Sequence, residues 1–214
     1  MSSSLRGRVG VLGGPFDPPH NAHLAVASAA RRQFELSRVV FVPNGIPPQK
    51  SVSDGVTSED RYRMARLAIA GRREFSVSRI EIDRSGPSYT IDTIRAMKED
   101  CPEGVCFILG ADQMLEIETW REPKALLGSV SFVVAPRAGI SLSFLGRPPY
   151  DVASIHVLDM GEVDLSSTAV RDRVARGESI EAWVPRSVAR YIEERGLYRV
   201  GVRLRSHGTG GQDR

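Results

Sequence analysis

The sequence contains no long apolar run. None of its 214 residues belongs to a stretch approaching the ~18 consecutive apolar residues of a membrane-spanning helix. The first residues, MSSSLRGR, also lack the apolar segment of a secretory signal peptide. We therefore expect a soluble, cytoplasmic protein with no membrane partner. The hydrophobic content of 41% is sufficient for the core of one domain.

Cysteine is equally scarce. Cys101 and Cys106 are the only two cysteines. One C-x4-C pair around a proline and a glycine does not supply the four ligands of a structural zinc site. In a reducing compartment we expect both side chains to be free thiols, so the cysteines predict neither a disulfide framework nor a metal centre.

A strong charge of one sign is also missing. The chain has 29 Lys and Arg residues against 26 Asp and Glu residues, a net charge of +3, and both signs are mixed along it. A small basic excess suits a protein that handles anionic nucleotides. Without a stripe of aromatic and basic residues we expect no nucleic-acid partner. The sequence leaves the oligomeric state open, including a homo-oligomer.

The most informative stretch is VGVLGGPFDPPHNAHL, from Val9 to Leu24. A short apolar run ends at Gly13 and Gly14, and a polar, proline-rich segment then leads into an apolar-periodic stretch, which predicts a strand, a tight loop and a helix. Glycines without Cβ atoms let phosphates approach the backbone, and the start of a helix attracts anions. His20 and His23 are three residues apart and should share the face above this loop.

The rest of the chain alternates strand-like and helix-like segments, which indicates an α/β fold with a doubly wound parallel sheet. Residues 75–82 alternate strictly and should form a half-exposed or edge strand, and 137–150 should be a mobile surface excursion. A capping box of Thr57 and Asp60 predicts a helix start. Further strands are expected at 39–42, 105–109, 131–135 and 155–158, and further helices over 21–34, after Thr90, after Ser166 and over 186–195.

Four residues in the middle of the chain are candidates for ligand binding, each beside a structural alternative. Lys50 is either a solvated loop residue or a cation over a substrate phosphate. Thr90 is either a helix N-cap or a ligand contact. Asp112 follows a strand, where ligands bind in open α/β sheets, and is either a helix cap or a carboxylate that accepts from a ribose hydroxyl or an adjacent main-chain group. Trp120, between two short helical pieces, is either a core residue or a platform for a ring.

A second cluster of polar residues occurs in LSSTAVR, residues 165–171. Ser166, Ser167 and Thr168 stand where a helix should begin, so their hydroxyls can cap it or bind an anion. Arg171 lies three residues after Thr168 and should reach the same face.

The stretch GGPFDPPHNAH resembles the GG(T/S)FDPxHxGH signature of the nucleotidylyltransferase superfamily, and LSSTAVR is similar to its ISSTxIR motif. Pro15 replaces the usual Thr or Ser, and Ala22 replaces the usual Gly. The proline removes a hydroxyl and a backbone N–H that could have bound phosphate.

From roughly Val9 to Arg199 the chain looks like the bacterial nicotinate-nucleotide adenylyltransferase family. The segments that carry this likeness are FVPNGIPPQK, GPSYTIDT, LGAD, ETWRE and VPRSVARYIEERGLYR. The resemblance implies a Rossmann-like fold in a single domain, 1–199, with a small helical C-terminal part at about 166–199. The tail, 200–214, should be disordered.

The resemblance also implies a reaction. The 5′-phosphate of nicotinate mononucleotide attacks the α-phosphorus of ATP, and Mg²⁺ is bound mostly by the triphosphate and water. It implies catalytic roles for His20, His23 and Arg171, which also binds ATP. It implies further ATP contacts from Gly13, Gly14, Phe16, Ser166, Ser167 and Thr168, and acceptor contacts from Lys50, Thr90, Asp112, Trp120 and Arg121.

Three alternatives stay open at this point. His20 and His23 have the spacing of zinc ligands, although no matching third and fourth ligand lies nearby in the sequence. The chain could be another nucleotidylyltransferase of the superfamily, such as one acting on phosphopantetheine. It could also be a nucleotide-binding sensor without catalysis, for which Pro15 and Ala22 are the only support.

Overall fold

The computed structural model describes residues 4–48, 52–162 and 164–199. Within them, six strands form one sheet in the order β3-β2-β1-β4-β5-β6, and all neighbouring pairs are parallel. Strands β1, β2 and β3 follow one another toward one edge of the sheet, and β4, β5 and β6 follow one another toward the other edge. The predicted doubly wound sheet is therefore confirmed. The strands are β1 (Val9–Gly14), β2 (Arg38–Pro43), β3 (Phe75–Val77), β4 (Val105–Gly110), β5 (Ser131–Ala135) and β6 (Ile155–Val157).

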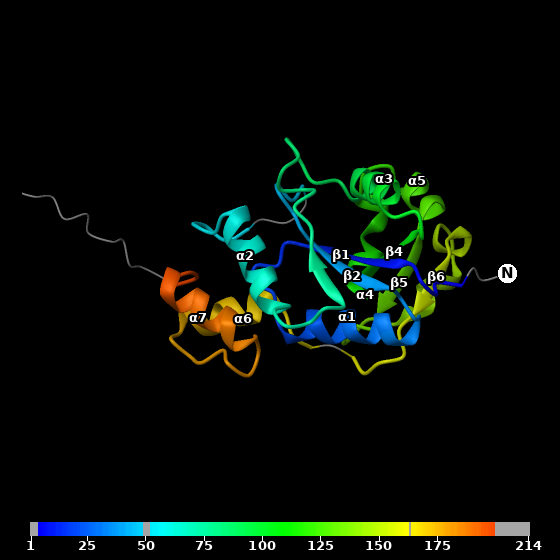
Figure 1. The fold of residues 1–214 in the computed structure, drawn as a ribbon. Coiled ribbons are helices and arrows are strands. Elements are labelled where there is room, and N and C mark those ends of the chain that lie inside the picture. Colours follow the sequence, from blue (N-terminus) through cyan, green and yellow to red (C-terminus); the bar gives the residue numbers. More distant parts are fainter. Residues whose placement is uncertain (1–3, 49–51, 163, 200–214) are drawn as a thin grey trace, which may run out of the picture.

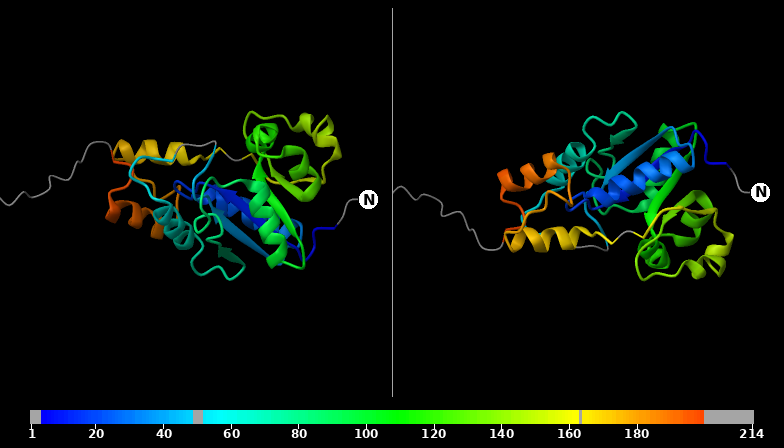
Figure 2. Two further views of the ribbon diagram at one scale, coloured as in Figure 1. Left: turned by 90° about the horizontal axis from the view of Figure 1, so that it is seen from above. Right: turned by 90° about the horizontal axis from the view of Figure 1, so that it is seen from below.

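Helices cover both faces of this sheet (Figure 1). The core on one face is completed by α1 (Asn21–Gln33), α2 (Ser58–Ala68), α6 (Ser167–Ala175) and α7 (Arg186–Arg195). The core on the other face is completed by α3 (Thr90–Asp100), α4 (Ala111–Leu115) and α5 (Pro123–Ser129). Figure 2 shows α6 and α7 at the same end of the molecule as α2. No helix in the described ranges is long and apolar enough to cross a membrane.

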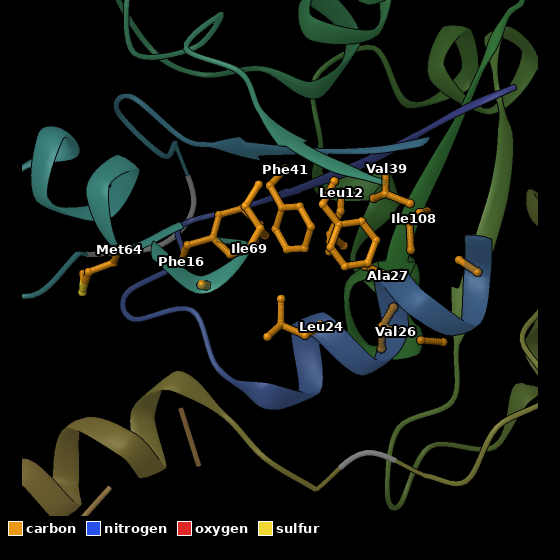
Figure 3. Packing of buried hydrophobic residues seen from close by; sticks show 14 of the residues in the cluster. Leu12, Phe16, Leu24, Val26, Ala27, Val39, Phe41, Met64, Ile69 and Ile108 are labelled. Atoms are coloured by element: carbon orange, nitrogen blue, oxygen red, sulfur yellow. The ribbon is translucent and has the colours of Figure 1, made fainter. Parts of the chain in front are cut away.

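The apolar run in β2 shows why the sheet is buried on both faces. Val39 and Phe41 point into the core beside α1, whereas Val40 and Val42 point into the core beside α3. A strand covered on both faces needs apolar residues at every position, not at alternate ones. In Figure 3, Phe41 lies beside Phe16 from the loop after β1, and their ring centroids are 5.6 Å apart.

The expected capping box at the start of α2 is confirmed. Thr57 Oγ1 accepts a hydrogen bond from the backbone N–H of Asp60 at 3.0 Å, and the Asp60 carboxylate accepts from the Thr57 N–H at 3.1 Å. These two bonds satisfy backbone donors that the helix itself leaves unpaired.

The expectation of a strand over 75–82 is wrong beyond Val77, although β3 is an edge strand as expected. The chain turns at Arg79, whose carbonyl accepts from the N–H of Ile82 at 2.8 Å. Glu81 then points inward, where its carboxylate accepts from Thr93 Oγ1 at 2.6 Å and from the Asn44 side chain at 2.7 Å. Gly45 permits this approach, because a Cβ there would lie 2.2 Å from the Glu81 carbonyl oxygen.

Segment 137–150 was expected to be a mobile surface excursion, and the burial of Tyr150 shows that it does not lie wholly at the surface. It contains the 3-10 helix η2 (Leu142–Gly146) and leads into η3 (Tyr150–Val152). Tyr150 is buried, packs against the Phe144 ring at 5.0 Å and donates to the Leu115 carbonyl at 3.3 Å. Its aromatic residues anchor the segment to the core. Lys50 and the expected disordered tail, 200–214, lie outside the described residues, and the boundaries of the single domain stay a prediction.

Candidate active site

Two neighbouring cavities open at the carboxyl ends of β1 and β4, where the strand order reverses direction. Open α/β sheets bind ligands at this position. The larger cavity has a volume of about 570 Å³ and the smaller one about 280 Å³. Gly13, Gly14, Pro15 and Gln113 line both, so these residues form a shared wall.

The two predicted histidines line the larger cavity at the start of α1. His20 is only 4% exposed, and its ring stacks on the His23 ring with centroids 3.8 Å apart. Burial, reinforced by the nearby Arg137 charge, lowers the pKa of His20 to about 4, so its ring is neutral near pH 7. Nδ1 of His20 is buried and has no hydrogen-bond partner among the described residues. A buried polar atom of this kind suits contact with a bound ligand.

The predicted start of α6 also lines the larger cavity. Ser166 caps the helix by accepting from the Ala169 N–H at 3.1 Å. Ser167 Oγ donates to the Pro18 carbonyl at 2.9 Å, and Thr168 Oγ1 accepts from Arg171 at 3.0 Å. Arg171 also donates to the Asp17 carbonyl at 2.9 Å. The two motifs, far apart in the sequence, are therefore hydrogen-bonded to each other.

The loop after β1 exposes mainly backbone to the larger cavity. The Phe16 side chain is only 1% exposed and packs on Phe41. A Cβ built at Gly14 would meet nothing closer than 4.0 Å, so the absent side chain leaves the cavity open above the backbone. Beneath the loop, the buried Arg61 donates to the Pro15 carbonyl at 2.9 Å and to the Gly45 carbonyl at 2.9 Å.

The smaller cavity contains three of the predicted acceptor residues: Thr90, Trp120 and Arg121. Trp120 lies edge-on to Phe107, with ring centroids 6.2 Å apart, and its Nε1 has no partner among the described residues. Thr90 is the first residue of α3 and Tyr89 is the N-cap, so the alternative that Thr90 is the cap is wrong. The exposed Arg121 guanidinium lies over the Tyr89 ring, 4.6 Å from its centroid.

Asp112, unlike Thr90, Trp120 and Arg121, does not line the smaller cavity. It lines the larger cavity with His20 and Arg171. It is the second residue of α4, whose N-cap is Gly110, so it does not cap the helix. Lys50 lies outside the part of the chain that the structure describes.

Several residues of the two cavities were not predicted from the sequence. Arg137 lines the larger cavity, and Asn44, Glu81 and Thr93 line the smaller one. Arg137 comes two residues after the end of β5, so the rule that placed Asp112 at a strand end could also have found it. No comparable signal marked the buried carboxylate of Glu81.

A metal centre made by the protein alone is not visible in the described ranges. Those residues contain no group of three or more His, Cys, Asp or Glu side chains close enough to hold a metal ion. The described residues therefore offer His20 and His23 no third and fourth zinc ligand. Cys101 and Cys106 are buried free thiols.

Comparison with known proteins adds to this geometry. The model of the cytidylyltransferase-like family matches residues 11–173, from β1 into α6. The chain belongs to this family. The matched range contains the glycines, both histidines and Arg171, so the resemblance seen in the motifs is confirmed.

Two curated relatives of this chain are named probable nicotinate-nucleotide adenylyltransferases. The protein from Leifsonia xyli subsp. xyli is 42% identical, over 93% of this chain and 98% of its own length. The protein from Moorella thermoacetica is 44% identical, over 90% of this chain and 92% of its own length. Among solved structures, the Plasmodium falciparum nicotinic acid mononucleotide adenylyltransferase complexed with NaAD superposes with a TM-score of 0.74, over 90% of this chain and 98% of that one. At 20% identity, this likeness shows the fold.

Proposed function

We propose that this protein is a nicotinate-nucleotide adenylyltransferase of NAD biosynthesis, acting in the cytoplasm. It transfers the adenylyl group of ATP to nicotinate mononucleotide and releases nicotinate adenine dinucleotide and pyrophosphate. The observation that carries this proposal is the pair of cavities that share the wall of Gly13, Gly14 and Pro15. Two nucleotides bound on either side of this wall would bring the attacking phosphate to the α-phosphorus. The names of the curated relatives support the same substrates.

The reaction needs no protein nucleophile and no general base. The attacking 5′-phosphate is already an anion, so a bond from its oxygen to the α-phosphorus can form as the bond to the pyrophosphate oxygen breaks. Catalysis then comes from aligning the two reactants and stabilising the charge that grows on pyrophosphate. The larger cavity has the hydrogen-bond donors that would stabilise the charge on pyrophosphate.

The two histidines would donate to the α- and β-phosphate oxygens. His23 Nδ1 accepts the backbone N–H of His20, at 3.2 Å, so a neutral His23 carries its ring proton on Nε2. The first backbone N–H groups of α6 have no partner within the helix and would bind the outer phosphates with Ser167 and Thr168. Arg171 and Arg137 would neutralise charge on the same phosphates.

The donor set around the larger cavity fits a magnesium ion that is held mainly by ATP. Asp17 and Asp112 are the carboxylates among its described lining residues. Asp17 already accepts hydrogen bonds from Ser53 and Tyr198, so the protein offers the ion few free carboxylate oxygens, and the triphosphate and water would supply most of its ligands. Mg²⁺ at substrate phosphates typically uses only one or two carboxylates and keeps several waters. When bound with ATP, the ion would offset negative charge on the triphosphate.

The acceptor would occupy the smaller cavity. Trp120 would stack on the pyridine ring, while Thr90 and backbone N–H groups near Arg121 would bind the nicotinate carboxylate. Asp112 is adjacent in sequence to Gln113 of the shared wall and would accept from a ribose hydroxyl. Lys50 would contact the acceptor phosphate.

One assay separates this proposal from its alternatives: pyrophosphate release with ATP, Mg²⁺ and a panel of phosphorylated acceptors. Turnover with nicotinate mononucleotide supports the proposal. Turnover only with another acceptor, such as phosphopantetheine, would assign a different transferase activity of the same family. ATP binding without release of pyrophosphate for any acceptor would leave a nucleotide-binding sensor.

A further inference from the structure

Asp17, in the loop after β1, is a buried carboxylate held by two distant segments. It is 3% exposed. The Tyr198 hydroxyl, 181 positions further along the chain, donates to Oδ1 at 2.7 Å. The backbone N–H and the hydroxyl of Ser53 both donate to Oδ2 at 2.8 Å. Donors on both oxygens fix the carboxylate plane, because a buried carboxylate that loses a donor is strongly disfavoured.

The backbone around Asp17 in turn holds the second motif. Arg171 donates to the Asp17 carbonyl, and Ser167 donates to the carbonyl of the next residue, Pro18, each at 2.9 Å. A rotation of the Asp17 backbone would therefore move both side chains. His20 lies three residues further along the same loop and lines the same cavity.

Tyr198 follows shortly after α7. Gly196, the C-cap of that helix, adopts a left-handed conformation with φ of 62°, and beyond it the Tyr198 hydroxyl reaches Asp17 in the loop after β1. On α7 itself, Tyr191 makes a similar bond, donating to the carboxylate of Asp60 on α2 at 2.8 Å. Asp60 is also 3% exposed. The described residues thus contain two phenol-to-carboxylate hydrogen bonds of similar length, onto two aspartates of equal exposure, and only one of them ends on the loop.

We propose that Tyr198, together with Ser53, is a positioning residue for the adenylyl transfer: the two orient Asp17 and so place Arg171 and Ser167 for the triphosphate. This inference rests on the proposed function. A purely structural role for Tyr198 would not act on one substrate alone. Arg171 and Ser167, which the backbone of Asp17 and Pro18 holds, both line the larger cavity. The effect should therefore fall on ATP and leave the acceptor site unchanged.

The test compares Tyr198→Phe with Tyr191→Phe, since each substitution deletes one hydroxyl from a buried carboxylate. We expect Tyr198→Phe to lower kcat/KM for ATP by about tenfold or more, within the loss known for small misplacements of reacting groups, while the acceptor KM stays within about twofold of the unmodified enzyme. Tyr191→Phe should keep the kinetics of the unmodified enzyme. In an Arg171→Ala background, Tyr198→Phe should cost less than it does alone, because the two residues act through one contact.

Three results would overturn the inference: unchanged kinetics in a folded Tyr198→Phe enzyme, equal losses in the two tyrosine variants, or full additivity with Arg171→Ala. If Tyr198→Phe does not fold, Ser53→Ala replaces it, and undiminished kcat/KM for ATP in that variant overturns the inference as well. Failure of the proposed function would look different, because the unmodified protein would then release no pyrophosphate with nicotinate mononucleotide.

Discussion

The backbone N–H of His20 donates to Nδ1 of His23 across 3.2 Å, and the two rings stack with centroids 3.8 Å apart. This arrangement fixes which nitrogen of His23 accepts, so a neutral His23 ring presents its other nitrogen as a donor. Two imidazoles packed this closely would repel each other if both were charged. Since the pKa of His20 is lowered to about 4 by burial and by the Arg137 charge, the His20 ring is neutral near pH 7 and can still donate a hydrogen bond to phosphate.

The first prediction concerns His20 as a donor to the leaving group. His20→Ala should lower turnover by about 10²–10³, the usual cost of one lost transition-state donor, and should weaken ATP binding far less. Steady-state kinetics and calorimetric titration with ATP measure the two effects. His156→Ala is the control, because His156, on β6, packs edge-on against Phe34 at the end of α1 and lines neither cavity. A loss of less than about tenfold in a folded variant would contradict a catalytic role.

The second prediction is a pH dependence of stability. The pKa of His20 is lowered to about 4 in the folded protein, against an ordinary value of 6.5. Between these values the unfolded chain binds a proton that the folded protein does not, so the free energy of unfolding falls as pH falls through this window, by at most ~1.4 kcal/mol per pH unit. Urea unfolding of the unmodified protein should thus show a steeper decline from pH 6.5 to 4.5 than the His20→Asn variant. Parallel slopes would show that His20 does not titrate in this way.

The third prediction concerns Arg171, which should interact with the triphosphate in both the ground state and the transition state. Arg171→Ala should therefore raise the ATP KM and also lower kcat. Arg176→Ala is the matched control, because Arg176 ends the same helix and pairs only with Glu178 among the described residues. An unchanged ATP KM in a folded Arg171→Ala enzyme would indicate that Arg171 has only a structural role.

The fourth prediction tests the departure from the family signature at Pro15. The Pro15 carbonyl accepts a hydrogen bond from Arg61 at 2.9 Å. A threonine would keep that carbonyl and would add a backbone N–H and a hydroxyl that could bind phosphate. Pro15→Thr should therefore leave kcat/KM for ATP intact or raise it. A measured loss of activity would show that the fixed φ of proline is required to shape this loop.

The fifth prediction concerns the choice of acceptor. Hydrogen bonds to a charged group are worth about 1.5–3 kcal/mol against about 1 kcal/mol for a neutral one, so N–H donors near Thr90 should favour nicotinate over nicotinamide mononucleotide. We expect at least a tenfold difference in kcat/KM, which corresponds to about 1.4 kcal/mol.

Two substitutions divide this acceptor preference into its parts. Trp120→Ala should reduce efficiency with both acceptors by a similar factor, because ring stacking does not depend on the substituent. Thr90→Val should act mainly on the nicotinate form. Equal efficiencies for the two acceptors in the unmodified enzyme would contradict the carboxylate pocket.

The parts of the fold that could be predicted from sequence are those fixed by local patterns. The apolar run of β2 and the capping box of Thr57 and Asp60 depend on neighbouring residues, and both appear where expected. Strict alternation of apolar and polar residues predicted a strand through Glu81. This pattern carries no information about the Asn44 and Thr93 side chains, which donate to the buried Glu81 carboxylate. A tertiary hydrogen-bond network overrode the local preference there.

The same distinction applies to the candidate site. His20, His23 and Arg171 lie within recognisable motifs, and the fold brings them to one cavity. The contact of Arg61 with Pro15 joins residues 46 positions apart, and that of Tyr198 with Asp17 joins residues 181 apart. No periodicity or spacing encodes such pairs, because each depends on where the completed sheet places its loops.

Arg61 has a further consequence for the spacing of the two substrates. Its guanidinium bridges two carbonyl oxygens, one on Pro15 in the loop after β1 and one on Gly45 in the loop after β2. A planar fork of fixed size can hold two acceptors at a set separation, which a lysine ammonium cannot do. Pro15 belongs to the shared wall, and Asn44, next to Gly45, lines the smaller cavity. In the proposed reaction Arg61, which lines neither cavity, would therefore set the distance between the ATP site and the acceptor site.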